Sequence, residues 1–176
     1  SEQRIQVLTP LVEACMASDE INKVLTYAPE ALHYYTEQQD IAEQAVLHKI
    51  LGNAYAYLYD FQEAFEHYLQ SLNLYQSLGK PLALGDVYIS IGWTYSGMEN
   101  YHKAKEFFLL AKDIATSHGD VRLEARAIGN LSNVYGSLKD YHTAIACHNQ
   151  AIELFQRIGS SAHIAVGFVN IGIEYS

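Results

Sequence analysis

Eight histidines and two cysteines are among the residues of this chain that could bind a metal ion or transfer a proton. The histidines form no HExxH motif, and none stands at zinc-ligand spacing from Cys15 or Cys147. The sequence also contains no Gly-x-Ser-x-Gly, P-loop or GxGxxG motif. We therefore expect no catalytic residue, no metal and no cofactor. The two isolated cysteines are typical of small buried residues in a reducing compartment, which favours the cytoplasm.

Polar residues at helical spacing indicate recognition rather than catalysis. Arg126, Asn130 and Asn133 follow one another at i, i+4 and i+7, so one helix face would carry all three. An asparagine amide can both donate to and accept from a peptide backbone, and an arginine can hold a carboxylate by two parallel bonds. Trp93 offers a broad apolar ring with one polar atom, which suits it to anchoring a side chain.

The net charge and the lengths of the apolar runs argue against two classes of partner. The formal net charge is −9 and the isoelectric point is near 5.2, so the chain repels a phosphate backbone, and no basic stripe offsets this. We expect no nucleic acid partner. Charged or amide residues interrupt every apolar run before it reaches the roughly 18 residues of a membrane span, so we expect no membrane partner. With 49% hydrophobic and 18% charged residues, the chain can form an ordinary buried core.

A repeat of forty residues organises the sequence. A Leu/Ile-x-x-x-Tyr anchor recurs at 51–55, 91–95, 131–135 and 171–175, and Gly follows the Leu or Ile in three of the four copies. Further columns keep the same step: Asp60, Asn100 and Asp140; Ala64, Ala104 and Ala144; Gly79, Gly119 and Gly159. Such a period is the signature of a repeat architecture.

Each period reads as a pair of helices. Leu47, Leu51, Ala54 and Leu58 form one helical stripe at i, i+4, i+7 and i+11. Asp or Asn then provides an N-cap for a second helix, as in the Asp60–Glu63 capping box, and Gly provides its left-handed C-cap. We expect hairpins at about 3–39, 41–78, 81–118 and 121–158 and an unpaired helix over 161–176, within a single array spanning 1–176.

These columns resemble the tetratricopeptide repeat. The second hairpin carries the family's residues as Leu51, Gly52, Tyr55, Ala64, Tyr68 and Ser71, and the next two hairpins repeat most of them. The family's unit is usually about 34 residues, so the chain looks like the long-unit members, such as Pins-type adaptors, kinesin light chains, Rap-type regulators and arrays of bacterial signalling proteins. The resemblance implies an all-α, right-handed α-solenoid that serves as a binding scaffold and not as an enzyme.

In such a solenoid the first helix of each pair lines a concave groove. The corresponding stripe contains Val46 and Ile50 beside the polar positions. The candidate ligand-binding residues are Lys49, Asn53, Tyr57, Asp86, Ser90, Trp93, Arg126, Asn130, Asn133 and Asn170. Alternatives remain open: the asparagines could be solvated surface, Arg126 could pair with Glu124 or Asp86, and Trp93 could pack between repeats.

The preferred hypothesis is a scaffold that binds a protein or peptide segment. The resemblance alone implies that it is the sensory or adaptor part of a bacterial signalling protein. An alternative is a receptor for a small signalling peptide that switches an attached effector domain. A third reading, a co-chaperone module for chaperone C-terminal tails, is weaker. Lys49 and Asn53 match that carboxylate clamp and Arg126 keeps a positive charge, but Ser90 and Asn130 depart from it.

The end of the sequence suggests a continuation or a dimer. The helix expected over 161–176 lacks a second helix that would cover Ala165, Phe168, Ile171 and Gly172. An apolar face of this kind is unfavourable in water. We expect the natural protein to continue, or this helix to pack against another copy in a homodimer.

Overall fold

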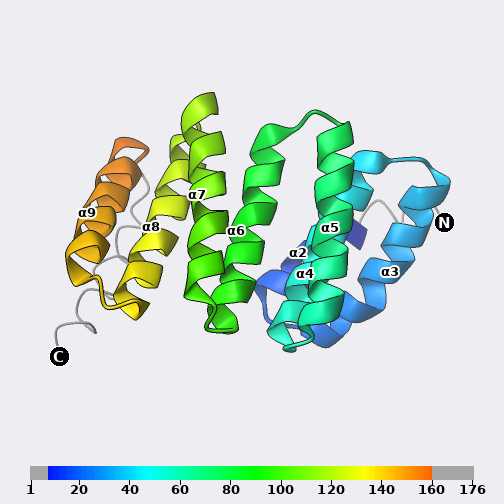
Figure 1. The fold of residues 1–176 in the computed structure, drawn as a ribbon. Coiled ribbons are helices and arrows are strands. Elements are labelled where there is room, and N and C mark those ends of the chain that lie inside the picture. Colours follow the sequence, from blue (N-terminus) through cyan, green and yellow to red (C-terminus); the bar gives the residue numbers. More distant parts are fainter. Residues whose placement is uncertain (1–7, 160–176) are drawn as a thin grey trace. The chain divides into compact units, whose positions relative to one another are not determined.

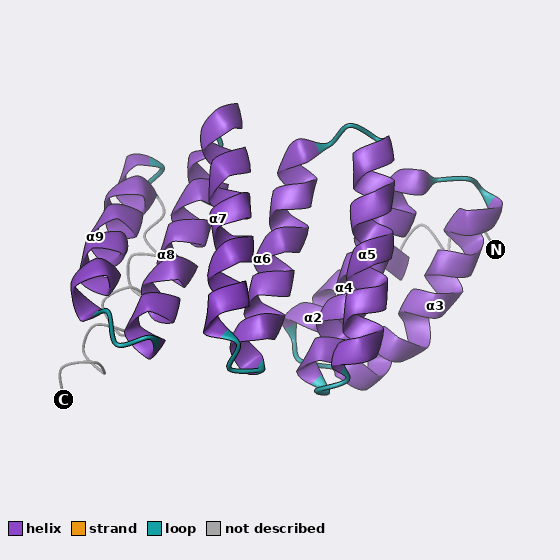
Figure 2. Cartoon of the chain, viewed as in Figure 1, coloured by secondary structure: helices purple, strands orange, loops and turns teal. Residues whose placement is uncertain are grey.

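The computed structural model describes residues 8–159, and this part of the chain consists of helices and short turns without a strand (Figures 1 and 2). The helices are α2 (Leu8–Ala17), α3 (Ile21–Glu37), α4 (Ile41–Tyr57), α5 (Phe61–Ser77), α6 (Pro81–Gly97), α7 (Tyr101–His118), α8 (Val121–Ser137) and α9 (Tyr141–Arg157). The predicted all-α class is confirmed. Residues 161–176, with Asn170 and the expected dimer surface, lie outside the described residues.

Five of the described helices begin directly after a capping side chain. Asp40, Asp60, Asp120 and Asp140, and Asn100 in front of α7, each accept a hydrogen bond from the backbone N–H three residues further on. The N–H of Leu123, for example, lies 2.9 Å from Oδ1 of Asp120. These bonds satisfy one of the N–H groups that a helix start leaves without a partner. The Asp and Asn N-caps predicted for the second helices are confirmed.

In the later hairpins the two ends use different residues for the same backbone geometry, whereas in the first hairpin the non-glycine Gln39, with φ of 57°, follows the second helix as well. Gly79, Gly119 and Gly159 follow the second helices with φ of 61°, 69° and 66°, as the sequence predicts. The first helices also end in the left-handed region, at the non-glycine residues Asp19, Tyr59, Glu99 and Lys139. An L-residue with a side chain is strained there, and glycine is not.

The described chain divides into two compact units, one ending at Ser90 and the other beginning at Ile91, so the boundary falls within α6. In the first unit, α2, α3, α4 and α5 pack one after another. Its core includes Val12, Val24, Ala28, Leu47, Leu51 and Ala54. In the second unit, α8 packs against both α7 and α9, and its core includes Ala125, Ile128, Ala151, Leu154 and Phe155.

Close packing of an aromatic ring on a glycine recurs in both units. A Cβ at Gly52 would lie 2.6 Å from the Tyr68 ring, and a Cβ at Gly92 would lie 2.5 Å from the Phe108 ring. The glycine therefore lets each first helix approach the second more closely than a larger residue would allow.

Three residues differ from the helical stripes expected from the sequence. Ile50, expected in the groove stripe, is buried in the core of the first unit. It lies three residues after Leu47, which puts it on the same helix face. Leu58, expected at the end of its core stripe, and Met98, forty residues later in the same repeat column, are exposed. Both directly follow a helix, in the turn, where the neighbouring helix no longer covers the side chain.

Candidate functional site

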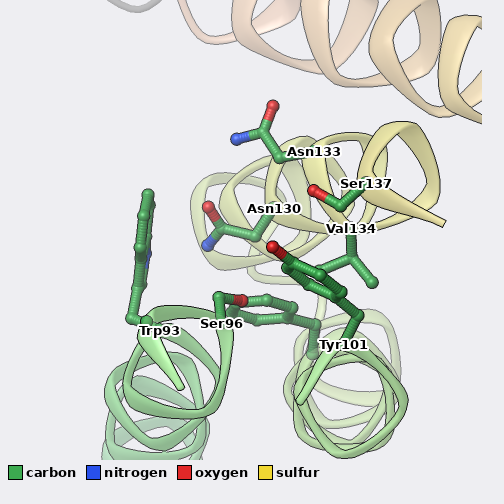
Figure 3. Close-up of a pocket in the computed structure, with 9 residues that line it drawn as sticks. Trp93, Ser96, Tyr101, Asn130, Asn133, Val134 and Ser137 are labelled. Atoms are coloured by element: carbon green, nitrogen blue, oxygen red, sulfur yellow. The ribbon is translucent and has the colours of Figure 1, made fainter. Parts of the chain in front are cut away.

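A pocket of about 340 Å³ opens in the second unit, where the end of α6, the start of α7 and the C-terminal half of α8 meet. Nine residues line it (Figure 3): Trp93, Ser96, Gly97, Tyr101, Phe108, Asn130, Asn133, Val134 and Ser137. Three of the predicted ligand-binding residues, Trp93, Asn130 and Asn133, thus lie around one hollow.

Trp93 forms one wall of the pocket. Its neighbours Gly92 and Thr94 are buried on the packing face of α6, so Trp93 lies on the other side of the helix. The Trp93 side chain is 56% exposed. A tryptophan that served only to fill a contact between repeats would be more deeply buried. The exposed ring favours the anchor interpretation over the packing one.

The opposite wall comes from α8. Asn130, Asn133 and Ser137 are spaced i, i+3 and i+7, so one face of α8 carries two amides and a hydroxyl. Figure 3 shows the Asn130 amide pointing toward the space beside the Trp93 ring, with the Tyr101 hydroxyl in the same region. These groups can donate and accept hydrogen bonds in several directions.

The floor of the pocket is apolar. Phe108 and Val134 are almost fully buried, and both contribute to the lining. None of the nine lining residues carries a charge. An apolar floor under uncharged hydrogen-bonding groups is typical of a site that takes an apolar side chain together with its backbone.

The remaining predicted residues do not line this pocket. Lys49, Asn53, Asp86 and Ser90 are half-buried and Tyr57 is exposed, all in the first unit. Arg126 is half-buried on α8, one turn before Asn130, and is not among the lining residues.

The Asn53 amide has a structural role. Its Oδ1 accepts a hydrogen bond from the Tyr68 hydroxyl at 2.9 Å, which joins α4 to α5. Because this oxygen is already used within the hairpin, Asn53 is a weaker candidate for ligand binding than Asn130 or Asn133.

Tyr101, Ser96 and Ser137 were not predicted from the sequence. Tyr101 shares a repeat column with Phe61 and Tyr141, at the first position of each second helix. That column repeats an aromatic residue, which indicates packing as readily as binding. Ser96 and Ser137 carry no sequence signal that separates them from ordinary surface serines.

Metal-binding clusters and membrane-spanning helices are not found in the described part of the chain. No group of three or more histidine, cysteine, aspartate or glutamate side chains in residues 8–159 is arranged to hold a metal ion. Within that same range, no helix combines the length and hydropathy needed to cross a bilayer. Both described cysteines are free thiols.

Sequence comparison places the chain in a family. A model of the tetratricopeptide repeat matches residues 43–117, and another model of the same repeat matches residues 125–157. Together the matches cover more than half of the chain, which therefore belongs to the tetratricopeptide repeat family.

Two curated relatives are about a quarter identical to this chain over the residues that align. The chicken 43 kDa receptor-associated protein of the synapse is 26% identical over 179 residues, covering 96% of this chain and 43% of that protein. Human SH3 domain and tetratricopeptide repeat-containing protein 2 is 27% identical over 135 residues, covering 74% of this chain and 10% of that protein. The chain thus spans less than half the length of either relative.

Solved structures show the same fold at low identity. A Rap protein complexed with competence and sporulation factor superposes with a TM-score of 0.81 at 18% identity, covering 88% of this chain and 43% of that one. Aspartyl phosphate phosphatase F from Bacillus subtilis superposes with a TM-score of 0.85 at 14% identity, covering 94% of this chain and 43% of that one. A signal transduction ATPase with a tetratricopeptide repeat sensor from Pyrococcus horikoshii superposes with a TM-score of 0.77 at 21% identity, covering 93% of this chain and 25% of that one. The fold is an all-α, tetratricopeptide-like solenoid.

Proposed function

We propose that this protein-binding repeat scaffold captures a peptide segment of its partner in the pocket between α6, α7 and α8. The observation that carries the proposal is the position of Trp93 beside the same hollow as Asn130 and Asn133. A tryptophan anchor with neighbouring amides supplies apolar contact and backbone hydrogen bonds together. The scaffold itself would do no chemistry, because its site offers binding groups only.

The pocket explains how a segment would be held. A side chain of the ligand would lie against the Trp93 ring and above Phe108 and Val134, and the Asn130 and Asn133 amides would bind the ligand backbone. Each such hydrogen bond contributes on the order of 1 kcal/mol, and loss of a central tryptophan anchor costs about 2 kcal/mol or more. Trp93 would therefore dominate the affinity.

The absence of charge in the lining favours an uncharged, internal segment of the partner. A terminal carboxylate buried without a charged partner would lose more in desolvation than it gains. This argues against chaperone C-terminal tails as the ligand of this pocket, since Arg126 is not part of the lining.

A second candidate function is a receptor for a small signalling peptide that switches an attached effector domain. It is favoured by one neighbouring structure, the Rap protein complexed with competence and sporulation factor. The idea that the chain belongs to a cytoplasmic bacterial signalling protein rests on the same likeness. The two candidate functions share the pocket and differ in whether the ligand is a free peptide or part of a larger protein.

A random peptide library displayed on phage would test the proposal, because selection from it does not require the natural ligand. Peptides selected on the full chain should lose at least about tenfold in affinity for Trp93→Ala, and a comparable amount for the Asn130→Ala, Asn133→Ala double variant. Tyr141→Ala is a matched control, because Tyr141 is also 56% exposed in the same unit but does not line the pocket.

The control should bind like the unaltered chain. If the selected peptides bind all these variants equally well, the pocket is not the binding site and the proposal is wrong.

A further inference from the structure

Two histidine rings meet inside the hairpin of α4 and α5. Nδ1 of His48 lies 2.9 Å from Nδ1 of His67, and the ring centroids are 5.2 Å apart with an interplanar angle of 40°. Both side chains are half-buried. The distance is that of a hydrogen bond, so one Nδ1 carries a hydrogen and the other accepts it.

A tyrosine ring also packs against one of the two histidines. The Tyr55 ring stacks on His67, with centroids 5.4 Å apart and an interplanar angle of 11°. In the next hairpin Tyr95 and Phe107 stack in the same way, at 5.5 Å and 17°. His67 thus occupies a position where the repeat accepts a non-titrating ring.

The repeat does not need histidine at either position. Forty residues later the two columns hold Tyr88 and Phe107, and eighty residues later they hold Ile128 and Cys147. None of these four residues gains a proton between neutral and mildly acidic pH. The hydrogen-bonded pair is therefore particular to the α4–α5 hairpin among these three hairpins.

Protonation would strain this contact in two steps. A first added proton gives an imidazolium that can still donate to the neutral ring, but it places a charge in a half-buried site. A second added proton gives both Nδ1 atoms a hydrogen, so two donors and two positive charges would face each other at 2.9 Å. The rings must then separate.

We propose that the His48–His67 pair makes the α4–α5 hairpin acid-sensitive, so that protonation separates the two rings and loosens the packing of α4 on α5. The ring of Tyr68, which packs on Gly52, lies in the same interface and would loosen with it.

On balance, burial and the neighbouring charges shift the pKa values of the two histidines in the direction that favours loss of stability in acid. Burial and then the neighbouring His67 lower the pKa of His48 from 6.5 to about 4. Burial also lowers the pKa of His67, although Glu63 and Glu66 on α5 oppose that shift. Both folded-state pKa values lie below the unfolded value, so the unfolded chain binds these protons more tightly. The stability that the neutral pair contributes is fully present above pH 6.5 and is lost as the pH decreases toward 4.

The test compares urea unfolding of the full chain with that of a His48→Tyr, His67→Phe variant, which carries the residues of the next repeat. Between about pH 7.5 and about pH 5, the unfolding equilibrium constant of the unaltered chain should rise on the order of tenfold through His48, since solvent screening of this half-buried ring reduces the full effect. The variant should show a clearly smaller rise, because only the other six histidines remain. Equal rises in the two proteins would overturn the proposal.

Two further measurements keep the proposal testable if that variant folds poorly. His48→Gln retains a hydrogen-bonding side chain without the titration, and it should also reduce the pH dependence. In the unaltered chain, NMR titration of the ring nitrogens should show depressed midpoints for both His48 and His67. Ordinary midpoints near 6.5 for both rings would contradict the shared hydrogen bond.

Hydrogen exchange at about pH 5 locates the change. At equal pH, the amides of α4 and α5 should exchange faster in the unaltered chain than in the folded His48→Tyr, His67→Phe variant, while α8 and α9 exchange alike. A uniform difference across both hairpins would mean that the pair affects only global stability, against the proposed local opening.

Discussion

A Cβ added to Gly92 would lie 2.5 Å from Cε1 of Phe108, closer than a real side-chain contact permits. Phe108 also forms part of the pocket floor. The glycine on α6 therefore does more than allow two helices to approach. It leaves the space that the Phe108 ring occupies beneath the proposed binding site.

The first prediction follows from this contact. Gly92→Ala should destabilise the chain by about 1–3 kcal/mol, because the added methyl overpacks the interface with Phe108. Gly97→Ala is the control: nothing lies within 4 Å of a Cβ there, and alanine favours the helix by up to about 1 kcal/mol. Urea denaturation of both variants checks the difference. Equal stabilities would show that α6 and α7 adjust to the methyl group without cost.

The second prediction concerns the left-handed residues at the hairpin turns. Lys139 has φ of 64°, where glycine is preferred, so Lys139→Gly should raise the free energy of unfolding by up to about 1 kcal/mol. Gly119, with φ of 69°, provides the reverse test: Gly119→Ala should lower it by about 1 kcal/mol. Thermal melts of the two variants should move in opposite directions. Shifts of the same sign would rule out backbone strain as the cause.

Much of the fold could be predicted from the sequence because the repeat signals agree with one another. Asp60 and Asp120 predicted helix starts, Gly79 and Gly119 predicted helix ends, and the forty-residue period linked them. The left-handed geometry at Tyr59 was not predictable, since tyrosine rarely adopts it and gives no signal of its own.

The site was predictable in part. Asn130 and Asn133 followed from helical spacing, and the structure brings them to one pocket with Trp93. Tyr101 was missed because its side chain reaches the pocket from a second helix, which a one-helix stripe does not include. Ile50 was assigned to the groove because spacing alone does not fix which side of a half-buried helix meets its neighbour.

The third prediction separates a structural asparagine from a binding one. The Tyr68 hydroxyl donates to Asn53, so Asn53→Ala should cost about 0.5–1.5 kcal/mol in stability. Tyr68→Phe should cost a similar amount, and a double-mutant cycle should show that the two losses do not add. Asn133 is exposed, and Asn133→Ala should change the stability by less than about 0.5 kcal/mol. Additive losses at Asn53 and Tyr68 would show that the hydrogen bond does not contribute in solution.

The fourth prediction uses Trp93 as a reporter of its own pocket, since it is the single tryptophan of the sequence. With its ring 56% exposed, the free chain should show strong collisional quenching of tryptophan fluorescence by acrylamide. Weak quenching in the free chain would mean that the ring is covered in solution and the pocket is closed.

The most direct test of the binding account is the change in that quenching when a library-selected peptide is added. If the peptide occupies the pocket, acrylamide quenching of Trp93 should fall and its emission should shift to shorter wavelength, with the same midpoint as binding. The Asn130→Ala, Asn133→Ala variant should need a higher peptide concentration for the same change. A peptide that binds the chain tightly while the accessibility and emission of Trp93 stay constant would contradict the account.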